Sequence, residues 1–269
     1  MTRQQNHKSD SDELSLRLAV LIDADNAQAA VIEGLLGEVA RFGEATVKRI
    51  YGDFTSSRSS GWKKVLQKFA IKPVQQFAYT TGKNATDSTM IIDAMDLLYT
   101  RKFDGFCLVT SDSDFTGLAM RIREEGLTVF GFGEQKTPEA FKNACHKFIF
   151  TEVLRDSPPD EAGKEDKDRK SASKKAESKS EKVHQAAKAT PVLPRKFMRN
   201  ALEQSSDDSG WANLGTFGSY LNKLQPDFDS RNFGFEKLTK LFSSIDKFEI
   251  EQRDQQGGGR FKLIYVRNK

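Results

Sequence analysis

Three aspartates directly follow short apolar stretches of this sequence, and their carboxylates suit the binding of a hard cation. Leu16–Ile22 runs into Asp23, and Gly105–Thr110 leads to Asp112 and Asp114. Carboxylates without neighbouring His or Cys favour Mg²⁺ or Mn²⁺ over zinc. Such cations activate water and neutralise charge on phosphate groups, so the sequence predicts metal-dependent phosphate chemistry.

A fourth aspartate, Asp87, is placed by helical periodicity. At about 100° per residue along the expected helix Ala85–Tyr99, Asp87 falls on the same side as a stripe of apolar residues. The stripe consists of Met90, Ile91, Ala94 and Leu98. An acid on an apolar stripe needs a partner, because burying an unpaired charge is costly. A divalent cation shared with Asp23 and Asp112 would supply that partner.

Helix capping is the alternative interpretation for several of these polar residues. Asp25 and Asn26 precede one expected helix, and Ser111, Asp112 and Ser113 precede another. Each of them taken alone fits an N-cap. Capping does not explain why Asp23 and Asp112 both follow apolar strands while Asp87 is directed at the same place. The combination therefore predicts a shared acidic metal site.

The elements that position these acids alternate along residues 16–154. Expected strands are short apolar runs rich in β-branched and aromatic residues: Leu16–Ile22, Ala45–Tyr51, Ile71–Tyr79, Gly105–Thr110 and Thr128–Phe132. Expected helices show helical periodicity: Ala27–Phe42, Trp62–Phe69, Ala85–Tyr99 and Phe115–Glu125. Helical connections between buried strands indicate an α/β fold with a mostly parallel sheet. Ligands of such sheets bind beyond the carboxyl ends of the strands.

Composition divides the chain of 269 residues into two domains. Residues 1–15 are polar and lack an apolar signal segment, so we predict a disordered N-terminus. Residues 155–190 contain one Val and no Leu, Ile or aromatic residue, which predicts a flexible charged linker or, as an alternative, a lone solvated helix. The first domain then spans residues 16–154 and the second residues 191–269.

Overall composition excludes several classes of protein. No apolar run approaches the ~20 residues of a membrane-spanning helix. The two cysteines, Cys107 and Cys145, form no CxxC pair, which argues against a disulfide scaffold or zinc finger and predicts a cytoplasmic protein. A net charge of +4 permits an anionic partner without requiring one. No glycine-rich phosphate loop and no GxSxG motif is present.

The first domain contains four motifs in order: LIDADN (21–26), GKNATDSTMIIDAMDLLY (82–99), VTSDSDF (109–115) and GFGEQKTPEAF (131–141). With them it resembles the NYN domain of the bacterial LabA/DUF88 group, a relative of PIN-domain nucleases. The resemblance implies a metal-dependent ribonuclease fold with strand order 3-2-1-4-5. By position it implies metal ligands at Asp23, Asp87, Asp112 and Asp114. It also implies that Asn26 orients water or substrate.

Two further residues near the acidic motifs need separate interpretations. Asp93 matches a recurrent acid of that family, but its helical angle favours a structural role. Lys83 lies just ahead of Asp87, where it could contact a phosphate of RNA or remain an ordinary exposed lysine.

The C-terminal part has the pattern of a winged helix, with expected helices and strands at Arg195–Gln204, Leu214–Leu224, Phe235–Ile245, Lys247–Gln252 and Arg260–Val266. Its stretch GWANLGTFGSYLNKLQPDFDSRNFGFEKLTKLFSS (210–244) resembles an OST-HTH (LOTUS) domain, a family associated with RNA binding or protein partners. The candidate RNA contacts are polar residues near the third helix and in the wing: Arg231, Asn232, Lys237, Lys240, Arg260 and Lys262. A solvated helix face is the alternative for these lysines.

The sequence therefore predicts a metal-dependent ribonuclease that hydrolyses RNA phosphodiester bonds and carries an RNA-binding module. One alternative is a haloacid-dehalogenase-like phosphatase, with Asp23 as nucleophile and Asp25 as acid/base. That family has Thr or Val where Asn26 stands here, which counts against it. The other alternative is a non-catalytic RNA-binding adaptor that retains the acidic pocket.

Overall fold

The computed structural model describes residues 15–55, 61–77, 85–155, 193–254 and 262–269. Residues 1–14 of the predicted N-terminal stretch and residues 156–190 of the predicted linker lie outside the described residues, as do Lys83 and Arg260. Within the described part, no helix has the length and apolarity needed to cross a membrane.

The first domain is built on a parallel sheet with the order β3-β2-β1-β4-β5-β6. Its strands are β1 (Leu16–Asp23), β2 (Gly43–Gly52), β3 (Lys72–Gln75), β4 (Gly105–Val109), β5 (Thr128–Gly133) and β6 (Lys147–Phe150). The predicted α/β class and the order of the first five strands are confirmed. The sheet also has an edge strand, β6, that the sequence analysis did not predict.

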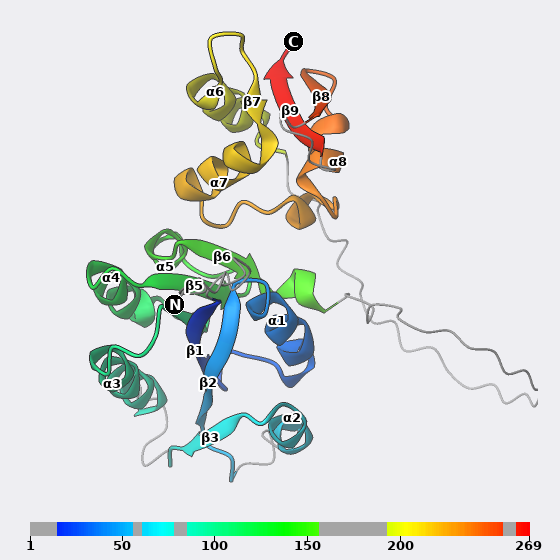
Figure 1. Cartoon of the computed structure of the whole chain (residues 1–269). Helices are drawn as coiled ribbons and strands as arrows, with labels where there is room; N and C mark the ends of the chain where they lie inside the picture. Colours follow the sequence, from blue (N-terminus) through cyan, green and yellow to red (C-terminus); the bar gives the residue numbers. More distant parts are fainter. Residues whose placement is uncertain (1–14, 56–60, 78–84, 156–192, 255–261) are drawn as a thin grey trace, which may run out of the picture.

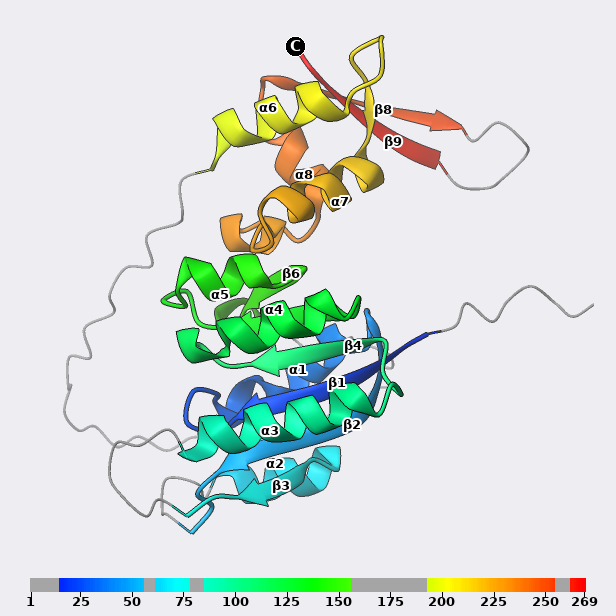
Figure 2. The same ribbon diagram turned by 90° about the vertical axis from the view of Figure 1, so that its left-hand side faces the viewer.

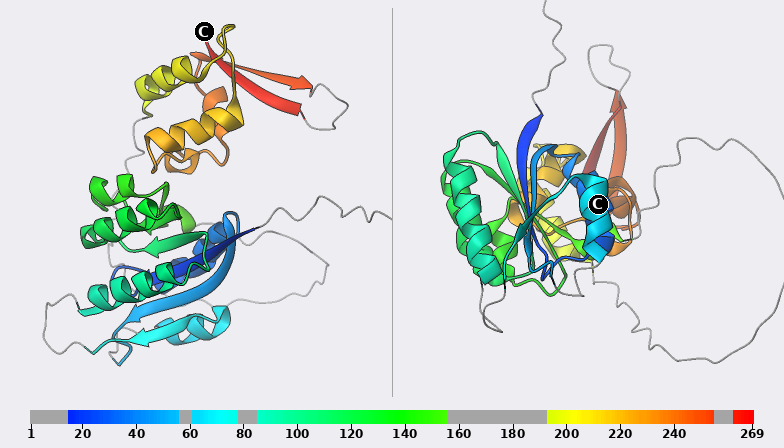
Figure 3. Two further views of the ribbon diagram at one scale, coloured as in Figure 1. Left: turned by 60° about the vertical axis from the view of Figure 1, so that its left-hand side comes forward. Right: turned by 90° about the horizontal axis from the view of Figure 1, so that it is seen from below.

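Helices cover both faces of this sheet (Figures 1 and 3). On one face lie α1 (Ile32–Val39) and α2 (Trp62–Phe69), and on the other lie α3 (Ala85–Tyr99), α4 (Thr116–Glu124) and α5 (Glu139–Ala144). Short 3₁₀ turns complete the domain: η1 (Ala29–Val31), η3 (Ser113–Phe115) and η4 (Thr151–Leu154). The expected helix 27–42 is therefore shorter, comprising η1 and α1.

The strand β1 is apolar along its length because it is covered from both sides. Leu18, Val20 and Ile22 enter the core beneath α1 and α2. Ala19 and Leu21 enter the opposite core, beneath α3 and α4. Continuous apolar runs are typical of strands buried on both faces of a parallel sheet. The burial of β1 thus fixes where its last residue, Asp23, lies.

The C-terminal domain has its own core and lies beside β6 and α5 of the first domain (Figure 2). Its elements are α6 (Arg195–Ser205), β7 (Ala212–Asn213), α7 (Leu214–Leu224), η5 (Ser230–Phe233), α8 (Leu238–Ser243), β8 (Phe248–Asp254) and β9 (Lys262–Asn268). The strands form an antiparallel sheet in the order β7-β9-β8. The expected third helix, Phe235–Ile245, is shorter at both ends, because the chain reaches the helical conformation only at Leu238.

Two glycines of α1 allow a matched test of how this helix packs against η4 in the first domain. A Cβ at Gly34 would lie 2.6 Å from the backbone oxygen of Leu154, whereas a Cβ at Gly37 would meet no atom within 4 Å. We predict that Gly37→Ala stabilises the fold by about 0.5–1 kcal/mol, because alanine favours a helix. Gly34→Ala should destabilise it by about 1–3 kcal/mol through overpacking. Urea unfolding of both variants measures the difference, and equal effects would contradict the described contact of α1 with η4.

Candidate metal centre

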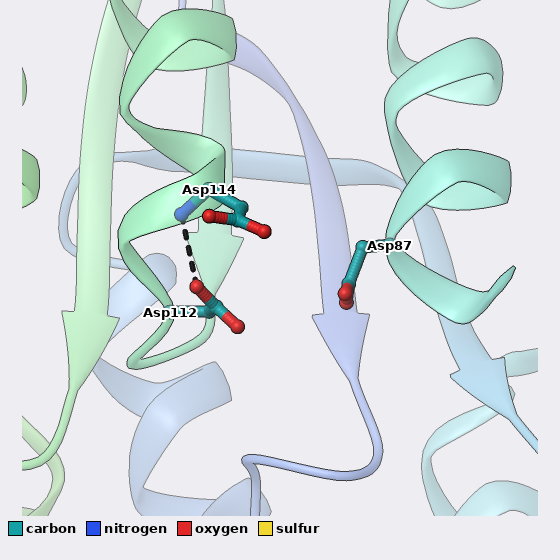
Figure 4. A group of neighbouring side chains, drawn as sticks. All are labelled: Asp87, Asp112 and Asp114. Atoms are coloured by element: carbon teal, nitrogen blue, oxygen red, sulfur yellow. Dashed lines mark hydrogen bonds between the residues drawn. The ribbon is translucent and has the colours of Figure 1, made fainter. Parts of the chain in front are cut away.

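Three aspartates converge at the carboxyl end of the sheet. Asp87 lies in the first turn of α3, while Asp112 and Asp114 belong to the turn that follows β4. One carboxylate oxygen from each residue lies within 4.8 Å of the others. Figure 4 shows Asp87 on α3 facing the two aspartates of the turn across the end of the sheet. Three convergent oxygen ligands are the donor set that a hard divalent cation prefers.

The turn after β4 is held by Asp112 itself. Its Oδ1 accepts a hydrogen bond of 2.9 Å from the backbone N–H of Asp114, so Asp112 is the N-cap of η3. The capping interpretation is therefore correct for Asp112, and it coexists with membership of the acidic cluster. Asp25 and Asn26 do not cap η1, whose N-cap position is Gln28.

Asp23 lies beside this cluster but is fully buried. Its Oδ1 accepts the backbone N–H of Asp25 at 2.9 Å, and its Oδ2 accepts the amide of Asn26 at 2.6 Å. A third donor, the hydroxyl of Thr110, lies 3.0 Å from Oδ2. The structure thus uses the Asn26 amide to hold Asp23, and a metal-binding role of Asp23 stays a prediction.

The sequence analysis missed Thr110, which connects two of the acids. This residue is 1% exposed. Its hydroxyl donates to Asp23 and accepts the backbone N–H of Asp112 at 3.1 Å. A signal was available, because Thr110 stands two residues before Asp112 in VTSDSDF. One hydroxyl therefore couples the end of β1 to the start of the turn after β4.

Burial and like charge raise the pKa values of Asp23 and Asp87. Burial raises the pKa of Asp23, although its three hydrogen bonds act in the opposite direction. The pKa of Asp87 is raised to about 6, first by burial and then by the charges of Asp23, Asp112, Asp114 and Asp25. A bound divalent cation would offset this repulsion. The residues present therefore fit a metal ion.

Asp93, on the same helix as Asp87, binds residues of β2 instead. Its carboxylate accepts hydrogen bonds from Arg49 and from the hydroxyl of Tyr51. Tyr51 is the register partner of Asp23 on the neighbouring strand. These bonds tie α3 to β2, which agrees with a structural role for Asp93 and helps to place Asp87.

The candidate RNA contacts of the C-terminal domain have different surroundings. Lys237 and Lys262 are exposed, and Lys240 forms a surface ion pair of 2.6 Å with Glu236. Asn232 donates its amide to the backbone oxygen of Asp227 at 3.0 Å. Arg231 pairs with Glu38 of the first domain, so its guanidinium is engaged within the protein.

Comparison with known families identifies both parts of the chain. The NYN domain model matches residues 17–154. This protein belongs to the NYN domain family. The OST-HTH/LOTUS domain model matches residues 193–259, so this NYN protein carries a C-terminal OST-HTH domain. No curated protein matches the chain.

Three solved structures are similar to parts of this NYN protein. An NMR structure of an uncharacterized protein from Nitrosomonas europaea is 50% identical, covering 38% of this chain and 92% of that chain with a TM-score of 0.28. A crystal structure of a Vibrio parahaemolyticus protein of unknown function is 18% identical, and the match covers 51% of this chain and 94% of that chain with a TM-score of 0.44. An NMR structure of residues 175–257 of a Chromobacterium violaceum protein is 29% identical, covering 30% and 84% with a TM-score of 0.24.

The raised pKa of Asp87 generates a prediction about pH. In metal-free protein above about pH 6, the Asp87 carboxylate is charged and repelled by its neighbours, so Asp87→Asn should raise the melting temperature. After discounting for solvent screening, we expect Asp87→Asn to raise the free energy of unfolding by about 1 kcal/mol and the melting temperature by about 2–4 °C. The gain should shrink as pH falls from about 6 towards about 4, because the folded wild-type protein takes up a proton before the unfolded chain does.

Thermal unfolding in EDTA across this pH range measures the effect. Asp96→Asn is the control, because Asp96 lies on the same helix and is exposed. A gain for Asp87→Asn that does not change with pH would contradict electrostatic crowding at the cluster.

The bridging hydroxyl of Thr110 generates a second prediction. Thr110→Val keeps the side-chain shape but removes one donor to Asp23 and the acceptor for the Asp112 N–H. We expect Mn²⁺ affinity to fall about 10–100-fold, as for other groups that orient metal ligands. Thr110→Ser retains the hydroxyl, so its Mn²⁺ affinity should stay within a few-fold of the wild-type affinity. Titration calorimetry with Mn²⁺ measures both, and unchanged affinity in Thr110→Val would contradict the bridging role.

Proposed function

We propose that this protein is a metal-dependent ribonuclease that hydrolyses phosphodiester bonds in RNA. The observation that carries the proposal is the convergence of Asp87, Asp112 and Asp114 at the carboxyl end of the sheet of an NYN domain. Ligands of open parallel sheets bind at this end. The net charge of +4 is compatible with a polyanionic substrate.

The proposed chemistry is divided between the metal and the chain. A bound Mg²⁺ or Mn²⁺ would supply an activated water and neutralise charge at the phosphate. Asp87, Asp112 and Asp114 would hold the ion through their carboxylate oxygens. Asp23 and Thr110 fix the position of the turn that carries Asp112, because their hydrogen bonds join it to β1.

The burial of Asp23 argues against the phosphatase alternative. A nucleophilic carboxylate must reach the substrate phosphorus, but Asp23 has no exposed surface. Both of its oxygens also accept hydrogen bonds from Asp25, Asn26 and Thr110. These contacts favour a supporting role for Asp23 over nucleophilic attack.

The OST-HTH domain would help to bind the RNA substrate. Its exposed lysines Lys237 and Lys262 are available for phosphate contacts, and Lys240 is available at the cost of its surface ion pair. Exposed ion pairs contribute little stability, so exchange of Glu236 for a phosphate would cost little.

The central test compares RNA cleavage by purified wild type and Asp112→Asn. We predict that wild type cleaves RNA with Mg²⁺ or Mn²⁺ and not with EDTA, and that Asp112→Asn loses at least about 100-fold of the rate. The exposed Asp96→Asn is the matched control and should retain activity. Undiminished cleavage by Asp112→Asn would refute the proposed site. Metal-dependent RNA binding by wild type without cleavage would instead support the non-catalytic adaptor.

A separate prediction concerns RNA affinity. Each phosphate contact by a lysine releases counterions, so Lys237→Ala should weaken binding and reduce the slope of log affinity against log salt by about 1. Lys102→Ala is the control, because Lys102 is exposed at the opposite end of the sheet, in the loop before β4. Fluorescence anisotropy in the Asp112→Asn background measures binding without cleavage. Identical salt slopes for Lys237→Ala and wild type would show that Lys237 does not contact the RNA phosphates.

A further inference from the structure

The outermost strand of the NYN sheet is covered by the C-terminal domain. β6 is the last strand in the sheet order, and no strand of the described residues lies along one of its sides. Its Phe148 N–H donates a hydrogen bond of 2.8 Å to the backbone oxygen of Pro226 in the OST-HTH domain. Free strand edges are prone to pairing with other chains unless they are covered. The segment that begins at Pro226 covers this edge.

The next residue of that segment forms a shielded ion pair with the NYN domain. Asp227 accepts a hydrogen bond of 3.0 Å from the ammonium group of Lys142 on α5. The two side chains are 13% and 12% exposed, respectively. The Lys142 ammonium also lies 5.7 Å from the centre of the Phe150 ring on β6. This pair is thus better protected from water than the surface ion pairs elsewhere in the described chain.

A second ion pair lies at the end of the segment. Arg231 donates two hydrogen bonds to the carboxylate of Glu38 on α1, at 2.8 and 3.1 Å, and Glu38 is only 6% exposed. Arg231 also binds Asp229 at 2.7 Å. Burial acts to raise the pKa of Asp229, but Arg231 outweighs it and holds that pKa below its usual range. One guanidinium therefore bridges a carboxylate from each domain, and it binds Glu38 in the bidentate geometry that fixes orientation.

We propose that Pro226–Arg231 is a docking segment that fixes the OST-HTH domain to the free edge of the NYN sheet. Small polar interfaces between domains usually permit relative motion. Here a strand-edge hydrogen bond and two shielded ion pairs each require one orientation of the two domains. The covalent connection raises the effective concentration of one domain near the other, so a weak interface is sufficient for docking. The domains therefore act as one body.

Docking changes the expected division of RNA-binding residues. Arg231 serves the interface, which leaves Lys237, Lys240 and Lys262 as the RNA contacts proposed for the described part of the OST-HTH domain. These lysines would then lie at a fixed distance from the acidic cluster, and RNA bound to them would reach the cluster in one register. This consequence rests on the proposed ribonuclease function, whereas docking itself does not.

Distance measurements between spin labels test the proposal without RNA. Cysteines introduced at the exposed positions Lys102 and Asp208 place one label on each domain. The native Cys107 and Cys145 are buried, and burial raises the pKa of each thiol, so they should remain unlabelled. Double electron–electron resonance on the full chain should show one narrow distance distribution.

Charge reversal at the interface tests whether the ion pair between Lys142 and Asp227 fixes the orientation of the two domains. Lys142→Glu and Asp227→Lys should each broaden the distribution, and the double variant should narrow it again because the pair is restored with opposite polarity. Lys68→Glu on α2, which breaks an exposed ion pair with Glu33 on α1, is the control and should leave the distance distribution narrow. A broad wild-type distribution, or a narrow one in both single variants, would overturn the proposal. A distance seen only between two chains would show docking onto a second copy and would also overturn it.

Discussion

Repulsion between carboxylates that must share one small volume is the constraint on which the rest of this structure depends. Asp87, Asp112 and Asp114 approach within 4.8 Å, with Asp23 buried beside them. Without a cation such a group disfavours the folded state, and the pKa of Asp87 is raised first by its burial and then by this repulsion. Favourable contacts elsewhere in the fold have to offset this repulsion and keep these residues together.

The fold meets this constraint by anchoring each acid through a different element. The apolar β1 is buried on both faces and carries Asp23 to the edge of the sheet. Thr110 joins Asp23 to the turn of Asp112, and Asp112 caps that turn. The contacts of Asp93 with Arg49 and Tyr51 tie α3, and with it Asp87, to the sheet. The acids are thus positioned by hydrogen bonds within the chain that form without a metal ion.

Local patterns in the sequence were enough to predict a parallel α/β sheet and the approach of the acids, whereas the strand order followed from the resemblance to NYN domains. The apolar run before Asp23 and the helical angle of Asp87 can each be read from a short stretch of sequence. Both signals arise from apolar side chains that the structure buries. The strand β6 was missed because it has only four residues and no alternation of polar and apolar residues. The partner of Arg231 could not be inferred from a local pattern, since Glu38 lies 193 residues earlier in the chain. Arg231 was therefore interpreted as an RNA contact, although the structure engages it between domains.

The central claim is that Asp87, Asp112 and Asp114 bind one divalent cation in common, and crystals grown with Mn²⁺ test it most directly. Anomalous diffraction locates manganese independently of any activity. The account predicts a strong anomalous peak within about 2.0–2.5 Å of carboxylate oxygens from all three residues. An anomalous map with no peak between these carboxylates at saturating Mn²⁺, or with manganese bound elsewhere only, would contradict it.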